Sequence, residues 1–496
     1  MKLKEENIKL IFGLKIRQLR QEKKLSLSEL SQESGLSISY LNEIEKGKKY
    51  PKSDKIASLS EALNIPYDNL VSLKLTKKLA PFADLLNSSF LGEVPLELFG
   101  IESSKLVELF YNAPIKVNAF IGALIEIARN YEMSKEQFYF AILRSYQELH
   151  DNYFEDLEAK SDEFIIENSL EDKYFITVNT LSEILTNKYN YIIKDDELEK
   201  HPELSDFRSV MIPGKPNVLL INKNLNESQK VFILARELGY KYLNLNERVY
   251  TFTWLKVNSF EQTLNNYKAS YFAGALLINR KKIVAEFETI FSKSTWEADV
   301  FKKLMMQFHS SPETFMHRLT NILPTYFNIN NLFFLRLVID EKNVGKYVIN
   351  KELHLGRKHD PHANLLHEHY CQGWISVRLL ELLNKRKETG KNLEPLVGVQ
   401  KSKYVDSEHE YFCIAFAGPV NDDKNACVTI GFLMNNEFKK KVNFWNDTQI
   451  PTRKVGVTCE RCSFSECKVR SVFASVIAEE KKKLEIESAL TRIFQK

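Results

Sequence analysis

A glycine between two short helical segments constrains the start of this chain more than any other feature. Residues 26–34 predict one short helix, and Ser37 suits the N-terminal cap of a second helix with a buried side that carries Leu41 and Ile44. Gly35 lies between them, and glycine accepts the left-handed conformation that a tight turn between helices requires. Gly47 ends the second helix. This order predicts a helix-turn-helix unit.

Three more helices complete the predicted N-terminal module, residues 1–75. Apolar residues at helical spacing predict a first helix over residues 8–22 and a fourth around Leu59, and Pro66 opens a fifth. The stretch LSLSELSQESGLSISYLNEIEKGKKYPKSDKIASLSEALNI resembles the Cro/CI-type (XRE family) DNA-binding domain. The resemblance implies a five-helix, lambda-repressor-like fold that binds double-stranded DNA, usually as a homodimer.

The same resemblance identifies the residues that would touch DNA. Side chains of the second helix of the unit would face the bases, and three lysines after it would lie near phosphates. Many relatives carry Gln early in the first helix of the unit, where this chain has Leu27, so one backbone contact is absent. The candidate DNA-binding residues are Ser37, Ser39, Tyr40, Asn42, Glu43, Lys46, Lys48 and Lys49.

The charge distribution supports the same interpretation. Residues 1–80 contain 16 Lys and Arg against 10 Asp and Glu, a net charge of +6, whereas the whole chain carries only +4. A basic segment attached to a nearly neutral body is typical of a nucleic-acid-binding module. A solvated, charged surface is the alternative that charge alone leaves open.

Composition excludes several classes of protein. With 44% apolar and 27% charged residues and few Gly and Pro, the chain is neither collagen-like nor low-complexity. Its longest apolar runs fall well short of the roughly 20 residues that a membrane span needs. The acidic start predicts no signal peptide, so we expect a cytoplasmic protein with no membrane contact.

The middle of the chain predicts two regions. Residues 76–165 carry apolar-periodic helical runs, which we interpret as a helical connector that could hold the dimer contact. Over residues 166–290 the runs YFITV, YNYII and NVLLIN predict short strands between helices. The run SQKVFILARELGYKYLNL resembles the ImmA/IrrE-type metallopeptidase fold, in which His-Glu-x-x-His and a later Glu bind zinc.

The zinc ligands implied by that resemblance are replaced in this chain. Arg236 and Tyr240 stand at the two His positions, and Asn266 stands where the third ligand would be. A guanidinium cannot bind zinc, and Tyr and Asn are poor substitutes. Glu237 persists, and we expect it to pair with a nearby Arg or Lys. The sequence therefore predicts a retained peptidase-like scaffold that is not an enzyme.

Residues 291–496 predict a mainly antiparallel sheet with helices, an α+β domain of the kind that senses small molecules. Strand-like runs such as NLFFLRLVID and YFCIAFAGPV alternate with polar turns. The order LARELGY, FAGALLI and SPETFMHRLTNI resembles the short-chain fatty acyl transcriptional regulator family, which includes PrpR and RamB. The whole chain is then a multidomain, α-rich α+β protein.

Cysteines cluster near the C-terminal end. Three of the six lie in the pattern Cys459-x2-Cys462-x4-Cys467, and in a reducing compartment metal ligation is a better use for them than a disulfide. The family resemblance adds Cys371 as a fourth candidate ligand. The set suits an iron–sulfur cluster of the [4Fe–4S] type, with zinc or no metal as the alternatives. Cys413 and Cys427 fall in apolar runs and are expected in the core.

Two functional hypotheses follow. The first is a transcription regulator whose C-terminal body responds to a metabolite, such as an acyl-CoA-like effector, or to a redox signal. The second is an ImmA-like regulatory metallopeptidase, or a phage-type or stress regulator that recruits a protein through this domain. The replaced zinc ligands favour the first.

Overall fold

The computed structural model describes residues 5–72, 96–99, 134–204, 206–251, 257–339, 346–356, 368–389, 394–420 and 424–494. The chain divides into two compact units, Met1–Ile142 and Leu143–Lys496. Most of the predicted helical connector, residues 76–95 and 100–133, lies outside the described residues. Within the described part, no helix is both long and apolar enough to cross a membrane.

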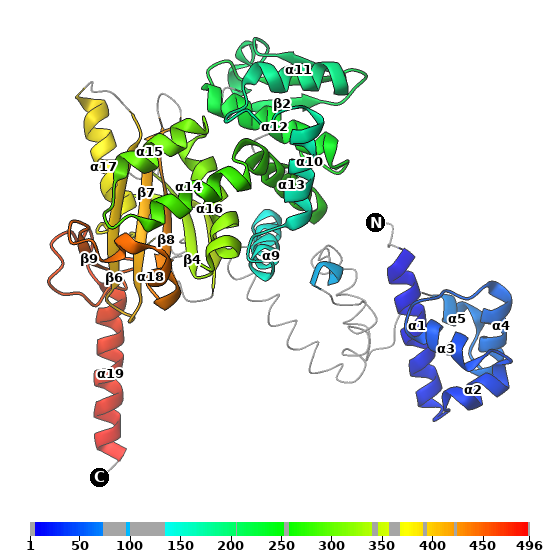
Figure 1. Ribbon diagram of the computed structural model, residues 1–496. Coiled ribbons are helices and arrows are strands. Elements are labelled where there is room, and N and C mark those ends of the chain that lie inside the picture. Colours follow the sequence, from blue (N-terminus) through cyan, green and yellow to red (C-terminus); the bar gives the residue numbers. More distant parts are fainter. Residues whose placement is uncertain are drawn as a thin grey trace. The chain divides into compact units, whose positions relative to one another are not determined.

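The first unit contains the five predicted helices (Figure 1). Ser26 begins the second helix with a capping box, and Gly35, at φ 67°, ends it in the left-handed conformation. A close approach fixes another glycine: a Cβ atom added at Gly13 would stand 2.1 Å from the carbonyl oxygen of Ile44. The helices are α1 (Glu5–Glu22), α2 (Leu27–Ser34), α3 (Ile38–Glu45), α4 (Ser53–Ala62) and α5 (Tyr67–Val71), and the short η1 (Leu96–Phe99) follows.

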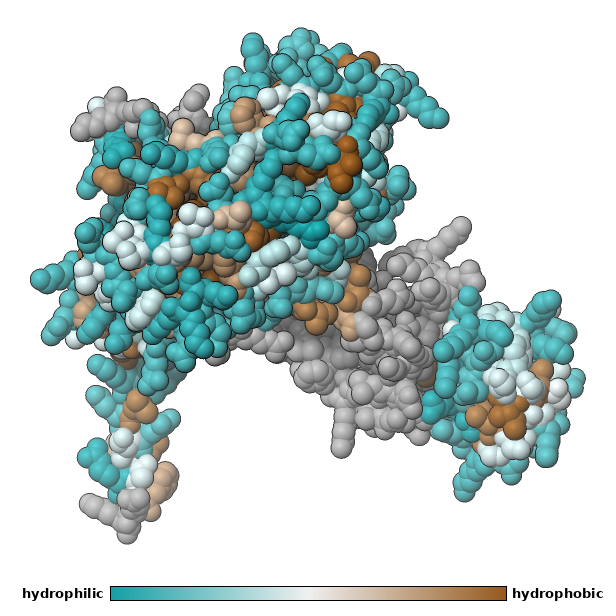
Figure 2. All heavy atoms as spheres, in the orientation of Figure 1, coloured by the Kyte–Doolittle hydropathy of each residue, from teal (hydrophilic) through white to brown (hydrophobic). Residues whose placement is uncertain are grey.

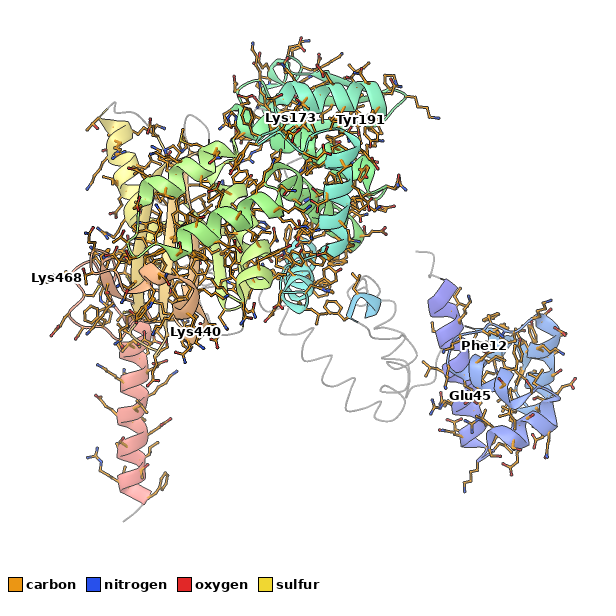
Figure 3. All side chains as sticks on the ribbon, in the orientation of Figure 1. Phe12, Glu45, Lys173, Tyr191, Lys440 and Lys468 are labelled. Atoms are coloured by element: carbon orange, nitrogen blue, oxygen red, sulfur yellow. The ribbon has the colours of Figure 1, made fainter. Side chains whose placement is uncertain are left out.

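Two of the basic residues in this unit serve its interior. Arg20 forms a two-pronged ion pair with Glu45, at 2.6 and 2.8 Å, which joins α1 to the end of α3. Lys15 donates to the carbonyl oxygen of Asn69 at 2.8 Å, and burial lowers its pKa. Figure 3 labels Glu45 and Phe12, whose ring belongs to the apolar core of the unit. Part of the predicted positive charge therefore stabilises the fold and is not on the surface.

The second unit begins with helices packed on a small sheet. The sheet has the order β1-β3-β2, with β1 parallel and β2 antiparallel to β3. The expected strand YFITV is wrong, because Thr177 caps a helix that starts at Val178. The elements are α9 (Lys135–Leu149), α10 (Glu155–Glu167), α11 (Val178–Tyr189), β1 (Tyr191–Lys194), η2 (Leu198–Lys200), η3 (Pro202–Leu204), β2 (Ser209–Ile212), β3 (Asn217–Ile221), α12 (Glu227–Tyr242) and α13 (Phe260–Leu277).

A six-stranded sheet follows, in the order β5-β4-β8-β7-β6-β9. Its neighbours are antiparallel except for β6 and β9, as expected for a mainly antiparallel sheet. The elements are α14 (Arg280–Ser292), α15 (Ala298–Gln307), α16 (Pro312–Phe327), β4 (Leu332–Ile339), β5 (Tyr347–Leu355), α17 (Ile375–Glu388), β6 (Leu396–Tyr404), β7 (Glu410–Pro419), β8 (Asn425–Leu433), α18 (Asn436–Lys441), η4 (Asn443–Asn446), β9 (Thr452–Val455) and α19 (Ser475–Phe494).

Helices cover both faces of this sheet (Figure 1). On one face, α15 and α16 pack on the strands, and α17 packs on the other. Alternating side chains of β7 serve the two cores: Phe412 faces the α16 side, and Cys413 faces the α17 side. The first core continues from Phe164 on α10 to Ile450 after η4. The peptidase-like part and the sheet therefore share one core, and the predicted boundary at residue 290 stays a prediction.

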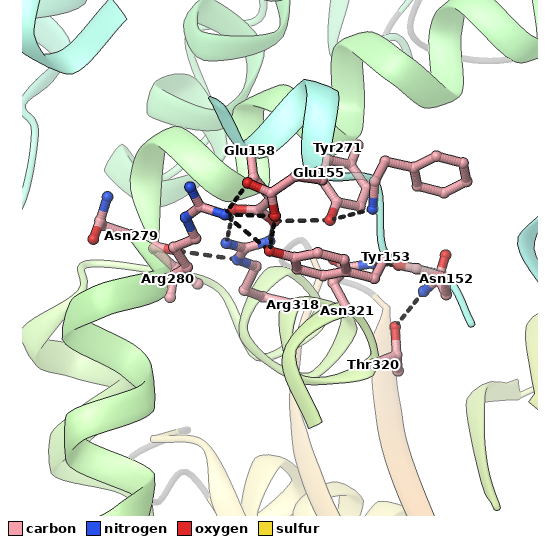
Figure 4. Close-up of polar contacts among 12 residues, drawn as sticks. Asn152, Tyr153, Glu155, Glu158, Tyr271, Asn279, Arg280, Arg318, Thr320 and Asn321 are labelled. Atoms are coloured by element: carbon pink, nitrogen blue, oxygen red, sulfur yellow. Dashed lines mark hydrogen bonds and ion pairs between the residues drawn. The ribbon is translucent and has the colours of Figure 1, made fainter. Parts of the chain in front are cut away.

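A buried polar network joins the two parts of that unit (Figure 4). The carboxylate of Glu158 on α10 accepts from both terminal nitrogens of Arg318 on α16, at 2.5 and 2.8 Å. Tyr271 on α13 donates to the same carboxylate at 2.7 Å. Arg280, at the start of α14, binds Asp162 of α10 at 2.9 Å. Four helices that are distant in sequence are thus held in one arrangement.

Candidate functional site

Of the eight candidate DNA-binding residues, Ser37 caps α3 at its start, and the other seven lie on α3 and in the turn after it. Leu41 and Ile44 turn into the core, and the remaining side chains of the helix are partly or fully exposed, apart from Glu45. The hydroxyl of Ser37 accepts from the backbone N–H of Tyr40 at 3.2 Å, so this residue caps the helix. Ser39 is exposed with its side chain available to a ligand.

Charge on this face is concentrated in the turn. Lys46, Lys48 and Lys49 are all exposed. Lys49 pairs with Glu43 at 2.7 Å and lies 5.8 Å from the centre of the Tyr40 ring. The hydrogen bond that Lys49 donates to the carboxylate of Glu43 raises the pKa of Lys49. Lys46 and Lys48 are therefore the cations better placed to meet phosphates.

Sequence reasoning missed one exposed residue of this face. Ile38 is 49% exposed in the first turn of α3, although its spacing from Leu41 would place it on the buried side. Its position directly after the cap Ser37 leaves it beyond the core. An exposed apolar side chain at the start of such a helix can contact the methyl group of thymine.

The residues at the former zinc positions form an internal polar pair. Tyr240 on α12 and Asn266 on α13 meet through a hydrogen bond of 3.0 Å from the Tyr hydroxyl to the Asn oxygen. This contact brings together two of the three predicted ligand positions. Burial raises the pKa of Tyr240, so its hydroxyl stays protonated. Arg236, one turn earlier, is also buried, and burial lowers its pKa.

Glu237 has the cationic partner that the sequence led us to expect. Arg248 donates to both carboxylate oxygens, at 2.7 and 2.9 Å, and its guanidinium lies 3.9 Å from the centre of the Tyr240 ring. Tyr191 of β1 also reaches Glu237, at 3.4 Å. Both carboxylate oxygens of Glu237 therefore accept hydrogen bonds from within the fold. Sequence reasoning did not name Arg248, which stands alone in a polar stretch.

Backbone pairing brings the cysteine segments together. The cysteine loop (residues 456–471) pairs with the segment before α17: the N–H of Cys371 donates to Val457 at 3.0 Å, and that of Cys459 donates to His369 at 2.8 Å. The N–H of Gly456 lies 3.4 Å from the sulfur of Cys371. Arg470 closes the loop by donating to the carbonyl oxygens of Cys459, Cys462 and Phe464, at 2.7, 3.1 and 2.6 Å.

The thiols of the loop differ in environment. Burial, with a smaller contribution from neighbouring Cys459 and Cys462, raises the pKa of Cys371 to about 11, although backbone hydrogen bonds to its sulfur oppose the rise. Cys467 is partly exposed. Among the described residues, no three His, Cys, Asp or Glu side chains are placed to hold a metal ion. Cys413 and Cys427 lie inside β7 and β8, where burial raises the pKa of each to about 12.

A cavity of about 360 Å³ opens between α10, the following loop and α14. Its lining is mixed, with Leu276 among the apolar side chains and Asp162 and Glu171 as acidic ones. Lysines stand at the same cavity: Lys282 donates to two backbone carbonyls, and Lys173, labelled in Figure 3, lies nearby. Because charged side chains of both signs lie beside apolar ones, this cavity suits a small molecule that has both polar and apolar parts.

Two family models match this chain. The helix-turn-helix model matches residues 16–70, and the IrrE N-terminal-like domain model matches residues 192–320. The second match starts later than the predicted region 166–290 and ends inside α16, at residue 320. It covers both halves of the Tyr240–Asn266 pair and Arg318 of the buried network.

Characterised relatives match the N-terminal module. The HTH-type transcriptional repressor RghR of Bacillus subtilis is 44% identical over 61 residues, which is 12% of this chain and 45% of that protein. The control protein C.BamHI of Bacillus amyloliquefaciens is 36% identical over 66 residues, which is 13% of this chain and 82% of that protein. The chain thus spans about half the length of the first of these relatives.

A solved structure resembles a larger part of the chain. It is titled Mycobacterium tuberculosis transcriptional regulator, and the match covers 67% of this chain and 93% of that one. The sequence identity is 18% and the TM-score is 0.45.

Proposed function

Because the N-terminal module of this chain belongs to the helix-turn-helix family, we propose that the protein is a sequence-specific regulator of transcription that binds double-stranded DNA as a homodimer. The observation that carries the proposal is the exposed face of α3 with Lys46 and Lys48 directly after it. Lysines at phosphates would position the module, and Ser39, Tyr40 and Asn42 would read base edges.

Replacing one base-reading side chain tests this proposal. Duplexes selected from a random pool with the full chain should share a preferred sequence. Asn42→Ala should lower the preference for it by roughly 1–3 kcal/mol, because a base contact is lost while phosphate contacts remain. Glu61→Ala, in the exposed part of α4, is the matched control. If Asn42→Ala and Glu61→Ala both leave the preference unchanged, α3 does not read the bases.

The effector proposal concerns the second unit. We propose that a small anionic metabolite, acyl-CoA-like as in a PrpR/RamB-type regulator, or a redox signal alters DNA binding. The cavity beside Leu276 and Lys173 supports the metabolite version. Leu276→Trp should fill the cavity and abolish the response to the effector while DNA binding persists. A retained response would place the effector elsewhere.

The cysteine loop is our candidate site for a metal or cluster, although no three ligand side chains among the described residues are already placed to hold an ion. We propose that Cys371, Cys459, Cys462 and Cys467 ligate a [4Fe–4S] cluster, with zinc as the alternative. When bound, such a group would supply a redox-sensitive crosslink. The chain's own part is to hold the thiols together through the pairing of Cys371 with Val457 and the clamp of Arg470.

Metal analysis separates the options for the loop. Anaerobically reconstituted protein should contain iron and sulfide, and Cys459→Ser with Cys462→Ser should contain neither. Cys413→Ser, in the core of β7, is a control for cysteine loss outside the loop. Zinc without iron would identify the alternative, and equal metal content in protein and double variant would refute ligation by the loop.

We further propose that the IrrE-like part does not hydrolyse peptides. The hydrogen bond between Tyr240 and Asn266 and the pairing of Glu237 with Arg248 support this. The triple variant Arg236→His, Tyr240→His, Asn266→Glu should gain zinc in equilibrium dialysis, because these positions are already adjacent. Chelator-sensitive cleavage of a peptide library by the unmodified protein would favour the metallopeptidase alternative.

A further inference from the structure

The last described helix, α19, has no covering partner. It extends for 20 residues away from the sheet of its own unit (Figure 1), and none of its side chains is buried against the parts of the chain that the structure describes. Several of those side chains are large and apolar: Ile486 is 51% exposed, Leu490 46% and Ile493 65%. Figure 2 shows apolar and polar atoms together along this helix.

The spacing of the exposed apolar residues defines a seam. Ile486, Leu490 and Ile493 follow one another at four and three residues, the spacing of d, a and d positions in a coiled coil. Lys483, two turns before Leu490, occupies the preceding a position. A polar residue at an a position is a known way to specify the register and oligomeric state of a coiled coil. Leu484 lies on the opposite side of the helix from Ile486 and is outside the seam.

The charges beside the seam match a second copy of the same helix. Lys482 lies at the g position before Lys483, and Glu487 lies at the e position after Ile486. In a parallel pair, the g residue of one helix faces the e residue five positions later on the other. Each parallel dimer would therefore gain two Lys482–Glu487 pairs. An antiparallel pair places e against e and g against g, and both pairs are lost.

We propose that α19 forms a parallel coiled coil with α19 of a second copy of this chain. The proposal rests on the proposed function and deepens it, because it names the element that joins the homodimer. Because the seam is short, it contributes only part of the affinity between two copies. The binding of two helix-turn-helix modules to neighbouring half-sites contributes the rest. Dimerisation through α19 raises the local concentration of the second module at the DNA.

Sedimentation of the full chain over a range of concentrations tests the seam. The unmodified protein should form a dimer. Leu490→Asp should raise the dissociation constant of the dimer by roughly tenfold or more, because a leucine that the dimer buries is replaced by a charge. Leu484→Asp removes an equally apolar side chain from the opposite side and should leave the dimer unchanged. Thermal unfolding should stay the same in both variants, since neither side chain is buried in the unit. A monomeric unmodified protein, or equal effects of the two variants, overturns the proposal.

A charge exchange tests the orientation. Lys482→Glu and Glu487→Lys should each weaken self-association, because each places like charges opposite one another in a parallel pair. The double variant in one chain should restore the dimer, and so should mixing the two single variants. Lys481→Glu, which points away from the seam, is the control. Failure of the double variant to restore association overturns the parallel pairing.

DNA binding distinguishes this proposal from the one on which it rests. A monomeric Leu490→Asp variant should still bind a single half-site with the same base preference, and should lose only the gain from a second half-site. If the unmodified protein binds no DNA at all, the proposed function is wrong, whatever the oligomeric state of the protein.

Discussion

At the scale of single residues, the lysines after α3 differ in the charge that they offer to DNA. Lys48 is exposed, whereas Lys49 shares its charge with Glu43 at 2.7 Å. Each phosphate contact contributes about 0.9 to the slope of log K against log salt. Lys48→Ala should therefore reduce that slope by about one, and Lys49→Ala by less. Fluorescence anisotropy at four salt concentrations measures both, and equal slopes for the two variants would contradict the assignment.

A second residue-scale prediction concerns His317 on α16. Burial and, to a smaller degree, the nearby positive charge of Lys351 lower its pKa to about 4, although Glu313 opposes the shift. The unfolded chain, with a His pKa near 6.5, therefore binds more protons than the folded chain between about pH 6.5 and pH 4. Stability should fall as pH falls through this window, by at most about 1.4 kcal/mol per pH unit.

Urea unfolding at pH 6.5, 5.5 and 4.5 measures that loss. His317→Gln cannot take up the proton, so its stability should change less over the same range. Glu313 affects stability at lower pH. Salt bridges to Lys351 and Arg336 outweigh burial and lower its pKa to about 2. Its contribution to stability is therefore lost only as pH falls below about 4.3. A variant with the same pH dependence as the unmodified protein would remove His317 as the cause.

At the scale of elements, the buried pair of Glu158 and Arg318 holds α10 against α16. Removing one partner leaves a buried charge without its counterion, so Glu158→Ala should lower the free energy of unfolding by about 3–5 kcal/mol. The double variant Glu158→Leu, Arg318→Met should lose much less, because no charge is left buried. Equal losses in chemical unfolding would show that the charge pair is not what holds these helices.

Local chemistry explains which elements could be predicted. The cap at Ser37 and the turn at Gly35 were predicted from neighbouring residues, and both are confirmed. The capping box at Ser26 is equally local but was not predicted. The false strand YFITV is β-branched and aromatic, as a strand would be, but the cap at Thr177 decides in favour of a helix. The residue types alone do not show whether the strand or the capped helix is favoured.

Long-range pairing explains what could not be predicted. Arg318 and Glu158 are separated by 160 residues, and the residues around each of them do not predict their contact. Arg248 was likewise missed, although a cationic partner for Glu237 was expected. The position of the candidate DNA-binding residues on and around α3 could be predicted, but the pairing of Lys49 with Glu43 could not.

At the scale of the whole molecule, the chain contains a helix-turn-helix module and a second unit. In the second unit, one apolar core extends from α10 to the six-stranded sheet. Because Leu170 and Leu276, which line the cavity, belong to that core, a change at the cavity can act on a single cooperative unit. The body also carries α19, the element proposed to pair two copies. Reading of DNA by the first unit is the central claim on which the other proposals depend.

Competition binding measures that claim most directly. The full chain is titrated with a duplex selected from a random pool, and with the same duplex after its bases are shuffled, at physiological salt. We expect the selected duplex to bind at least about 10³-fold more tightly, the lower end for specific recognition. Equal affinity for the two duplexes, or no binding to either even at low salt, would contradict the account.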